Sequence, residues 1–347
     1  MRQLPMITTD TSVVIPTRNR PDDLRRALAS VARQDAREAI AEVVVIENST
    51  NQASQSVCRE FGALPVRWLL NDPPLPMSAW ANRVFGSPEA NSEFFALLCD
   101  DDWWEPHHLS RSLGGLRRNP KAVVTWSGCI EYNSDSHTAL PRGHTIWAVS
   151  GHAADAQAVE IGLQDVLVAN LLTTAFHIST LVTRRAALAA VLPEIADGNP
   201  FDIDRHLTCV LATQGTTIYY PPPSIGVASH SGRESVNLGR TKEAELWWKR
   251  TTREIVELAK DAHIDLPAAF ESLLRESMED VPTLLSHAYF NGSRSIQDEL
   301  PMPESFNQAS RRLRMALRLR RYLPPAALKI LRLGGWMERN LPKQALA

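Results

Sequence analysis

The chain has 347 residues, of which 44% are hydrophobic and 22% are charged. A chain of this size and composition can bury a substantial core, which excludes a disordered protein and predicts about two domains. The net charge of -2 gives no reason to expect a nucleic-acid partner. No apolar run reaches the roughly 18 residues of a membrane span, and residues 1–10 lack the apolar stretch of a signal peptide. The four cysteines lie far apart, so we expect reduced thiols and a cytoplasmic location.

Short apolar runs alternate with helical patterns along much of the chain. Residues 12–16 and 42–46 are β-branched runs typical of buried strands, and a helix with apolar residues at helical spacing is predicted to begin at Pro21. Further strands are predicted at 66–70, 94–99, 122–126, 179–183 and 216–220, and further helices at 79–85, from 185, at 201–212 and from 241. This alternation predicts an α/β fold with a mostly parallel sheet, which binds ligands at the carboxyl ends of its strands.

Three consecutive aspartates follow the predicted strand at 94–99. Adjacent carboxylates repel one another, so Asp100, Asp101 and Asp102 are unfavourable together unless a cation or a donor-rich ligand binds them. Hard oxygen ligands suit Mg²⁺ or Mn²⁺ holding a diphosphate. The alternative is that Asp102 caps a following helix. The motif favours the metal site.

Other polar residues stand where site residues often lie. Glu47 ends the second predicted strand, where a carboxylate can accept hydrogen bonds from a nucleobase or a ribose. Asp202 and Asp204 begin a predicted helix, and either could act as a general base. His230 could supply a metal ligand and Arg233 a phosphate-binding cation. Taken singly, each is more often an ordinary turn, capping or surface residue.

The order of these features resembles that of family-two glycosyltransferases of the GT-A fold. The resemblance rests on VVIPTRNR at 13–20, EVVVIENST at 42–50, ANR at 81–83 and FFALLCDDDWWEPHHL at 94–109. It covers residues 11–235 and is most specific near the N-terminus. Three positions depart from the family pattern, since Glu47 stands for an Asp, Cys99 for the first aspartate of the metal motif, and Phe201 for the Glu that usually precedes the base.

The resemblance implies an inverting, hexosyltransferase-like enzyme that moves a sugar from a nucleoside-diphosphate sugar to an acceptor hydroxyl, with Mn²⁺ or Mg²⁺ on the diphosphate. Carried over by position, Glu47 would contact the nucleobase and Asp202 would be the base, with Asp204 as the fallback. Asp101 would contact the metal. The donor pocket would further include Pro16, Thr17, Arg20, Asn82, Asp100 and Arg233, and the metal site Asp100, Asp102 and His230.

The C-terminal part is predicted to be a separate helical region. The expected division is a GT-A catalytic domain at 1–235 and a helical region at 236–347. Residues 305–347 contain ten Lys/Arg and one acid, and a basic amphipathic helix at 311–333 could contact the inner face of a membrane. The alternative is packing on its own domain or on a homodimer partner. An envelope glycan, a lipid-linked molecule or a secondary metabolite all stay open as acceptors, which the polar loop predicted at 134–151 would help to select.

Two other classes of protein share parts of this pattern. A sugar nucleotidyltransferase would be expected to have a glycine-rich loop after its first strand, whereas residues 16–20 contain no glycine. A non-catalytic nucleotide-sugar-binding protein of the GT-A fold is suggested by Cys99 and Phe201, because both replace usual acids. The three consecutive aspartates and Asp202 argue against it.

Overall fold

The computed structural model describes residues 10–50, 52–88, 92–133, 138–142, 157–172, 174–196, 203–229 and 242–276. The chain forms two compact units. The first comprises Met1–Gly143, Ala154–Leu163 and Phe176–Thr241, and the second His144–Ala153, Gln164–Ala175 and Lys242–Ala347. Within the described ranges, no helix combines the length and the apolar character needed to cross a bilayer.

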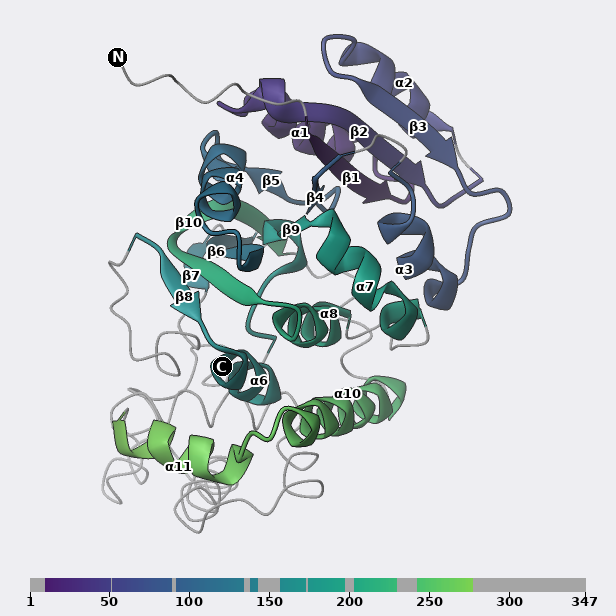
Figure 1. Cartoon of the computed structure of the whole chain (residues 1–347). Helices are drawn as coiled ribbons and strands as arrows, with labels where there is room; N and C mark the ends of the chain where they lie inside the picture. Colours follow the sequence, from purple (N-terminus) through teal and green to yellow (C-terminus); the bar gives the residue numbers. More distant parts are fainter. Residues whose placement is uncertain are drawn as a thin grey trace, which may run out of the picture. The chain divides into compact units, whose positions relative to one another are not determined.

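The first unit is built on one sheet (Figure 1). Its strands are β1 (Thr11–Thr17), β2 (Ile40–Glu47), β3 (Val66–Leu70), β4 (Phe94–Leu97), β5 (Trp103–Trp104), β6 (Ala122–Asn133), β7 (Thr138–Arg142), β8 (Val159–Ile161), β9 (Val182–Arg184) and β10 (Thr216–Ser229). They lie in the order β3-β2-β1-β4-β9-β6-β10-β5, with β7 beside β6 and β8 beside β10. β9 is antiparallel to both β4 and β6. The sheet is therefore mostly parallel, because β1, β2, β3, β4, β6 and β10 share one direction.

Helices cover both faces of this sheet. The first unit contains α1 (Pro21–Ala32), η1 (Arg37–Ala39), α2 (Ala53–Glu60), α3 (Met77–Phe85), α4 (His108–Arg118), η2 (Ile178–Thr180), α7 (Arg185–Ala196) and α8 (Ile203–Ala212). Residues of α1, α2 and α4 share one hydrophobic cluster with the strands. On the other side α7 packs against α3 and α8. The second unit contains nearly all of α6 (Leu163–Leu172), together with α10 (Lys242–Asp261) and α11 (Leu266–Glu276).

Burial on both faces explains why the first strand is a continuous apolar run. Val13 and Ile15 belong to the cluster under α1, while Val14 between them points the other way and is also fully buried. In α1, Pro21 occupies the first turn and Leu24 and Leu28 are fully buried. Burying a leucine contributes about 1.5–3 kcal/mol, so this helix is held mainly by its apolar face.

Several predicted boundaries were wrong. The strand predicted at 179–183 begins as the 3₁₀ turn η2, and only Val182–Arg184 forms a strand. The polar loop predicted at 134–151 contains β7, which pairs antiparallel with β6. The strand predicted at 216–220 continues to Ser229, because its three prolines lie where the register with β6 shifts and no donor is needed from them.

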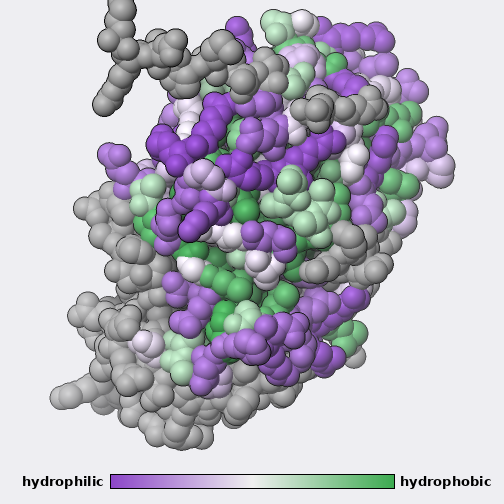
Figure 2. Space-filling model, viewed as in Figure 1, coloured by the Kyte–Doolittle hydropathy of each residue, from purple (hydrophilic) through white to green (hydrophobic). Residues whose placement is uncertain are grey.

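The described surface exposes few large hydrophobic side chains. Only Tyr132 and Leu246 stand out among the described residues, at 41% and 67% exposed. In Figure 2 hydrophilic residues cover much of the coloured face and hydrophobic ones form smaller groups between them. The described part of the chain therefore shows no broad apolar patch.

Candidate active site

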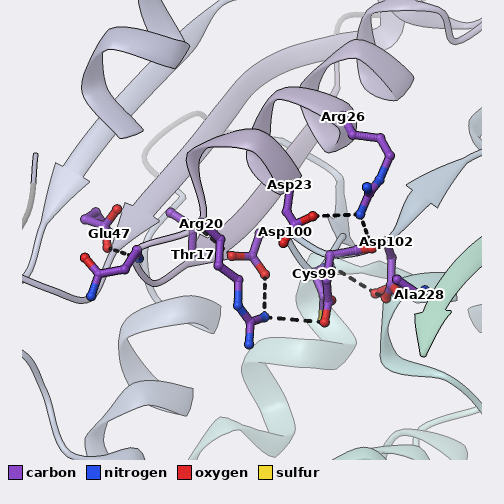
Figure 3. Close-up of polar contacts among 12 residues, drawn as sticks. Thr17, Arg20, Asp23, Arg26, Glu47, Cys99, Asp100, Asp102 and Ala228 are labelled. Atoms are coloured by element: carbon purple, nitrogen blue, oxygen red, sulfur yellow. Dashed lines mark hydrogen bonds and ion pairs between the residues drawn. The ribbon is translucent and has the colours of Figure 1, made fainter. Parts of the chain in front are cut away.

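The carboxyl ends of β1 and β4 meet at the acidic segment. The two strands are parallel neighbours, and Asp100, Asp101 and Asp102 follow β4 directly. All three residues are nearly inaccessible, with exposures of 5%, 5% and 0%. The carboxyl edge of a parallel sheet is where α/β proteins bind ligands, and this edge carries three buried acids, of which Figure 3 labels Asp100 and Asp102.

Asp100 is held by the last residue of β1 and by the loop that follows it. Its Oδ2 accepts a hydrogen bond of 2.8 Å from the hydroxyl of Thr17, and its Oδ1 lies 3.3 Å from Nη1 of Arg20. Burial raises the pKa of Asp100 to about 6, against the attraction of Arg20 and together with the repulsion of Asp101. The carboxylate is therefore costly to ionise without a further positive group.

Two arginines hold Asp101 from the side of α1. Nη1 of Arg20 lies 3.4 Å from Oδ2 of Asp101. Burial alone would lower the pKa of Arg20, but the charges of Asp100 and Asp101 outweigh that effect and raise it. Arg26 donates a hydrogen bond of 2.9 Å to the backbone oxygen of Asp101, and its guanidinium lies 5.2 Å from the ring centroid of Trp103. The acidic loop, residues 99–102, is thus fixed through its backbone as well as its carboxylates.

Asp102 is held by residues of η2 and β10. Its Oδ2 accepts a hydrogen bond of 2.5 Å from the hydroxyl of Ser179, and its Oδ1 accepts one of 3.3 Å from the backbone N–H of Ala228. Nδ1 of His177 lies 3.6 Å from the same Oδ2. Sequence reasoning missed Ser179 and His177, because a serine that begins a predicted strand and a histidine just before it give no signal that they meet a distant carboxylate.

The residues fit a divalent cation. One ligand atom from each of Cys99, Asp101 and Asp102 can be chosen so that all lie within 4.8 Å of one another, which is close enough to share one ion. The carboxylate oxygens suit Mg²⁺ or Mn²⁺, whereas the Cys99 thiol is a softer donor. Burial raises the pKa of that thiol well above its usual range, with further contributions from the charges of Asp102 and Asp101.

A fourth carboxylate, that of Asp204, affects Cys99 electrostatically. Asp204 lies in the first turn of α8, and its charge also contributes to the raised pKa of Cys99. The helix therefore presents an acid within electrostatic reach of the acidic loop. Four further predictions fall outside the described residues: Asp202, His230, Arg233 and the basic helix at 311–333.

Glu47 holds the loop after β1 in place. It ends β2 and is 1% exposed, and its Oε1 accepts a hydrogen bond of 3.2 Å from the backbone N–H of Asn19. Asn19 has a φ of 56°, a left-handed conformation that asparagine tolerates better than most residues. The same buried edge includes Pro16, which pairs with Ile46 of β2. Glu47 thus shapes the loop that carries Thr17 and Arg20.

The side-chain amide of Asn48 joins the end of β2 to the segment that follows β3. Nδ2 of Asn48 donates to the backbone oxygen of Leu75 at 3.1 Å, and its Oδ1 accepts from the backbone N–H of Leu75 at 2.7 Å. Asn71 donates to the same Oδ1 and accepts a hydrogen bond from Arg83 of α3. The predicted donor ligand Asn82 is exposed on α3, so Arg83 rather than Asn82 enters this network.

The mostly parallel sheet with helices on both faces is the architecture of the GT-A fold, and the acidic loop lies at its carboxyl edge. Residues 12–166 match the family model for glycosyl transferase family 2. This region is similar to that family, and the chain is a glycosyltransferase. No curated protein matches the chain by sequence.

Solved structures show the same fold at low sequence identity. TarS 1-349 of S. aureus, in complex with UDP-GlcNAc, is 14% identical with a TM-score of 0.51, over 88% of this chain and 92% of that one. A longer S. aureus TarS structure is 15% identical with a TM-score of 0.51, over 82% of this chain and 50% of that one. The mannosyltransferase PcManGT from Pyrobaculum calidifontis, in complex with GDP-Man and Mn²⁺, is 15% identical with a TM-score of 0.49, over 95% and 85%. The fold comparison rests on the two TarS structures.

Proposed function

We propose that this enzyme transfers a sugar from a nucleoside-diphosphate sugar to an acceptor hydroxyl, with inversion at the anomeric carbon and with the help of a divalent cation. The observation that carries the proposal is the cluster of ligand atoms at the carboxyl edge of the sheet, where one atom each of Cys99, Asp101 and Asp102 lies within 4.8 Å of the others. The family match at residues 12–166 supports the transfer reaction. The TarS complex with UDP-GlcNAc supports the class of donor.

The donor site is proposed at the carboxyl ends of β1 and β2. Thr17, Arg20 and Asp100 form one hydrogen-bonded group there, and Glu47 lies at the end of the next strand. Arg20 is the cation beside the acids, so it is placed to bind the diphosphate once a second positive charge neutralises the carboxylates. Glu47 then stands on the nucleobase side of this group.

Asp101 and Asp102, with Cys99 beside them, would hold Mn²⁺ or Mg²⁺. A bound ion supplies positive charge that stabilises the diphosphate as it leaves. Asp202, which matches the family's base by its position in the sequence, is the proposed base, and Asp204 in the first turn of α8 is the alternative. The base takes the proton of the acceptor hydroxyl as that oxygen bonds to the anomeric carbon, so the configuration inverts in one displacement.

Ligand-dependent thermal unfolding tests the donor and metal assignments. A ligand that binds only the native state stabilises it by about 2.7 kcal/mol at a hundredfold excess over its Kd. We expect one nucleoside diphosphate to raise the melting temperature in the presence of Mn²⁺ and to do so much less without it. Asp101→Asn should remove the metal-dependent part, whereas Asp22→Asn, at a side chain 93% exposed on α1, should keep it.

Absence of any shift with saturating nucleoside diphosphates would contradict the proposal. A metal-dependent shift without transfer to any hydroxyl acceptor would favour the non-catalytic nucleotide-sugar-binding alternative. With an acceptor in hand, Asp202→Asn should bind donor normally and lose transfer, and Asp204→Asn is the matched comparison. Transfer that survives in the Asp202 variant and is lost in the Asp204 variant would move the base to Asp204.

A further inference from the structure

We propose that Ser179 is a positioning residue for the metal and donor site, and that it acts by fixing the carboxylate of Asp102. The inference rests on the proposed function, because it concerns how the same acidic loop binds a cation. Ser179 belongs to η2, which lies 77 residues beyond Asp102 and far from the acidic motif in sequence. Neither the motif nor the family match assigns it a role.

Ser179 contacts the acidic loop at three points. Its hydroxyl accepts a hydrogen bond of 3.0 Å from the backbone N–H of Cys99 and donates one of 2.5 Å to Oδ2 of Asp102. Its backbone oxygen accepts a hydrogen bond of 2.8 Å from Nε1 of Trp104. One fully buried serine therefore holds Cys99 at the start of the loop, Asp102 at its end, and Trp104 two residues further on.

The backbone of Ser179 is itself held in place. Nδ1 of His177 accepts a hydrogen bond of 3.3 Å from the N–H of Ser179, so the histidine caps the short helix that carries the serine. Nδ1 of His177 also lies 3.6 Å from Oδ2 of Asp102. The hydroxyl oxygen of Ser179 accepts a hydrogen bond from the backbone N–H of Cys99. Its hydrogen therefore points in one favourable direction, toward the carboxylate of Asp102.

The hydrogen bond from Ser179 fixes the direction in which Asp102 can bind an ion. Asp102 is fully buried, and each of its oxygens already accepts a hydrogen bond, one from Ser179 and one from the backbone of Ala228. A carboxylate oriented in this way can offer an ion only its remaining lone pairs, in one fixed direction. Partners that orient a metal ligand typically change metal affinity by 10- to 100-fold when they are removed. The hydroxyl of Ser179 should have an effect of that size.

Ser30 provides a matched control. Its hydroxyl is also fully buried and also bonds to this loop, accepting a hydrogen bond of 3.1 Å from the backbone N–H of Trp104. It donates to the backbone oxygen of Ala27 in α1. Ser30→Ala therefore removes a comparable loop contact without removing a hydrogen bond to a carboxylate.

The experiment is a Mn²⁺ titration of the full chain, followed by the electron paramagnetic resonance signal of free Mn²⁺. Ser179→Ala should weaken Mn²⁺ binding by about 10- to 100-fold, whereas Ser179→Thr should restore it and Ser30→Ala should stay near the wild type. Nucleoside diphosphate binding in a chelator should change little in all three variants. In an Asp102→Asn background, Ser179→Ala should have no further effect on Mn²⁺ affinity.

Equal Mn²⁺ affinity in the wild type and Ser179→Ala would overturn the inference and leave the proposed function intact. Equal losses in Ser179→Ala and Ser30→Ala would also overturn it, because the loss would then reflect the loop rather than the carboxylate. Absence of Asp101-dependent Mn²⁺ binding in the wild type would instead contradict the proposed function. Should Ser179→Ala fail to fold, Ser179→Cys keeps the size with a weaker donor and takes its place in the same comparison.

Discussion

The hydroxyl of Thr17 donates a hydrogen bond of 2.8 Å to Oδ2 of Asp100, a residue 83 positions further along the chain. The contact joins the last residue of β1 to the loop that follows β4, so two neighbouring parallel strands share one polar group at their carboxyl ends. A buried carboxylate is costly unless donors surround it. Thr17 supplies a neutral donor to Asp100 and Arg20 a charged one.

Thr17→Val tests this contact, because valine has nearly the shape of threonine and lacks the hydroxyl. We expect the free energy of unfolding at pH 8 to fall by about 1–3 kcal/mol, the usual cost of leaving a buried acceptor without its donor. Urea unfolding measures the change. Thr17→Ser, which keeps the hydroxyl, should lose less, and equal losses in the two variants would show that the methyl group matters more than the hydrogen bond.

His108 should make the protein sensitive to acid. Its ring is fully buried, 4.7 Å from the indole of Trp104, and its Nδ1 lies 2.8 Å from the hydroxyl of Ser224. Burial lowers the pKa of His108 to about 3, with smaller contributions from Arg111 and His107. Between about pH 6.5 and 3, His108 is therefore protonated in the unfolded chain and neutral in the native state.

The stability due to neutral His108 is thus present above about pH 6.5 and is lost as the pH falls toward 3, by up to about 1.4 kcal/mol per pH unit. His108→Gln should flatten the dependence of unfolding free energy on pH in this window, even if it lowers stability at pH 7. His263→Asn, at an exposed histidine, serves as the control. An unchanged slope in the His108 variant would contradict the buried neutral state.

Gly226 should tolerate no side chain. A Cβ at this position in β10 would overlap the indole of Trp103, whereas a Cβ at Gly62 would meet nothing within 4 Å. Overpacking of this kind costs typically about 1–3 kcal/mol, so Gly226→Ala should lower the melting temperature clearly and Gly62→Ala should not. Trp103 directly follows Asp102, and Mn²⁺ binding should therefore weaken in Gly226→Ala as well. Equal melting temperatures for the two variants would rule out this packing.

Cys99 should bias the proposed metal site toward softer cations. Replacing the thiol by a carboxylate, as in Cys99→Asp, adds a hard oxygen where the ligand atoms of Asp101 and Asp102 already converge. We expect the affinity for Mg²⁺ to rise relative to that for Cd²⁺, measured by competition with Mn²⁺. Cys58→Ser, at a buried thiol of α2, is the control. A ratio that stays constant in Cys99→Asp would show that the thiol does not contact the ion.

Local patterns in the sequence were sufficient to predict the first half of the sheet. β1, β2 and β3 and the helix that begins at Pro21 lie where their apolar runs and spacing indicated. β1 and β2 are almost entirely buried, and buried strands appear in the sequence as consecutive apolar residues, whereas β3 is only partly buried. The predictions failed where pairing with a distant strand decides the structure, as in β7, which exists because β6 extends to Asn133 to meet it.

In the candidate site, too, some residues could be predicted from local sequence and others could not. The three aspartates could be found because they are adjacent in the sequence and unfavourable without a partner. Ser179 could not, because its role depends on a contact with Asp102 that only the folded sheet creates. Glu47 was expected near a nucleobase, and the structure adds a local task, since it also accepts a hydrogen bond from the backbone of Asn19.

The paired hydrogen bonds between Asn48 and Leu75 have a consequence for ligand recognition. The amide of Asn48 satisfies both backbone groups of Leu75, so the chain's own hydrogen bonds tie the segment after β3 to the end of β2. Binding on this side therefore requires little ordering of the chain, and the entropy lost on association falls mainly on the ligand. Differences in affinity between nucleotides should then report direct contacts with their bases rather than the folding of a loop around them.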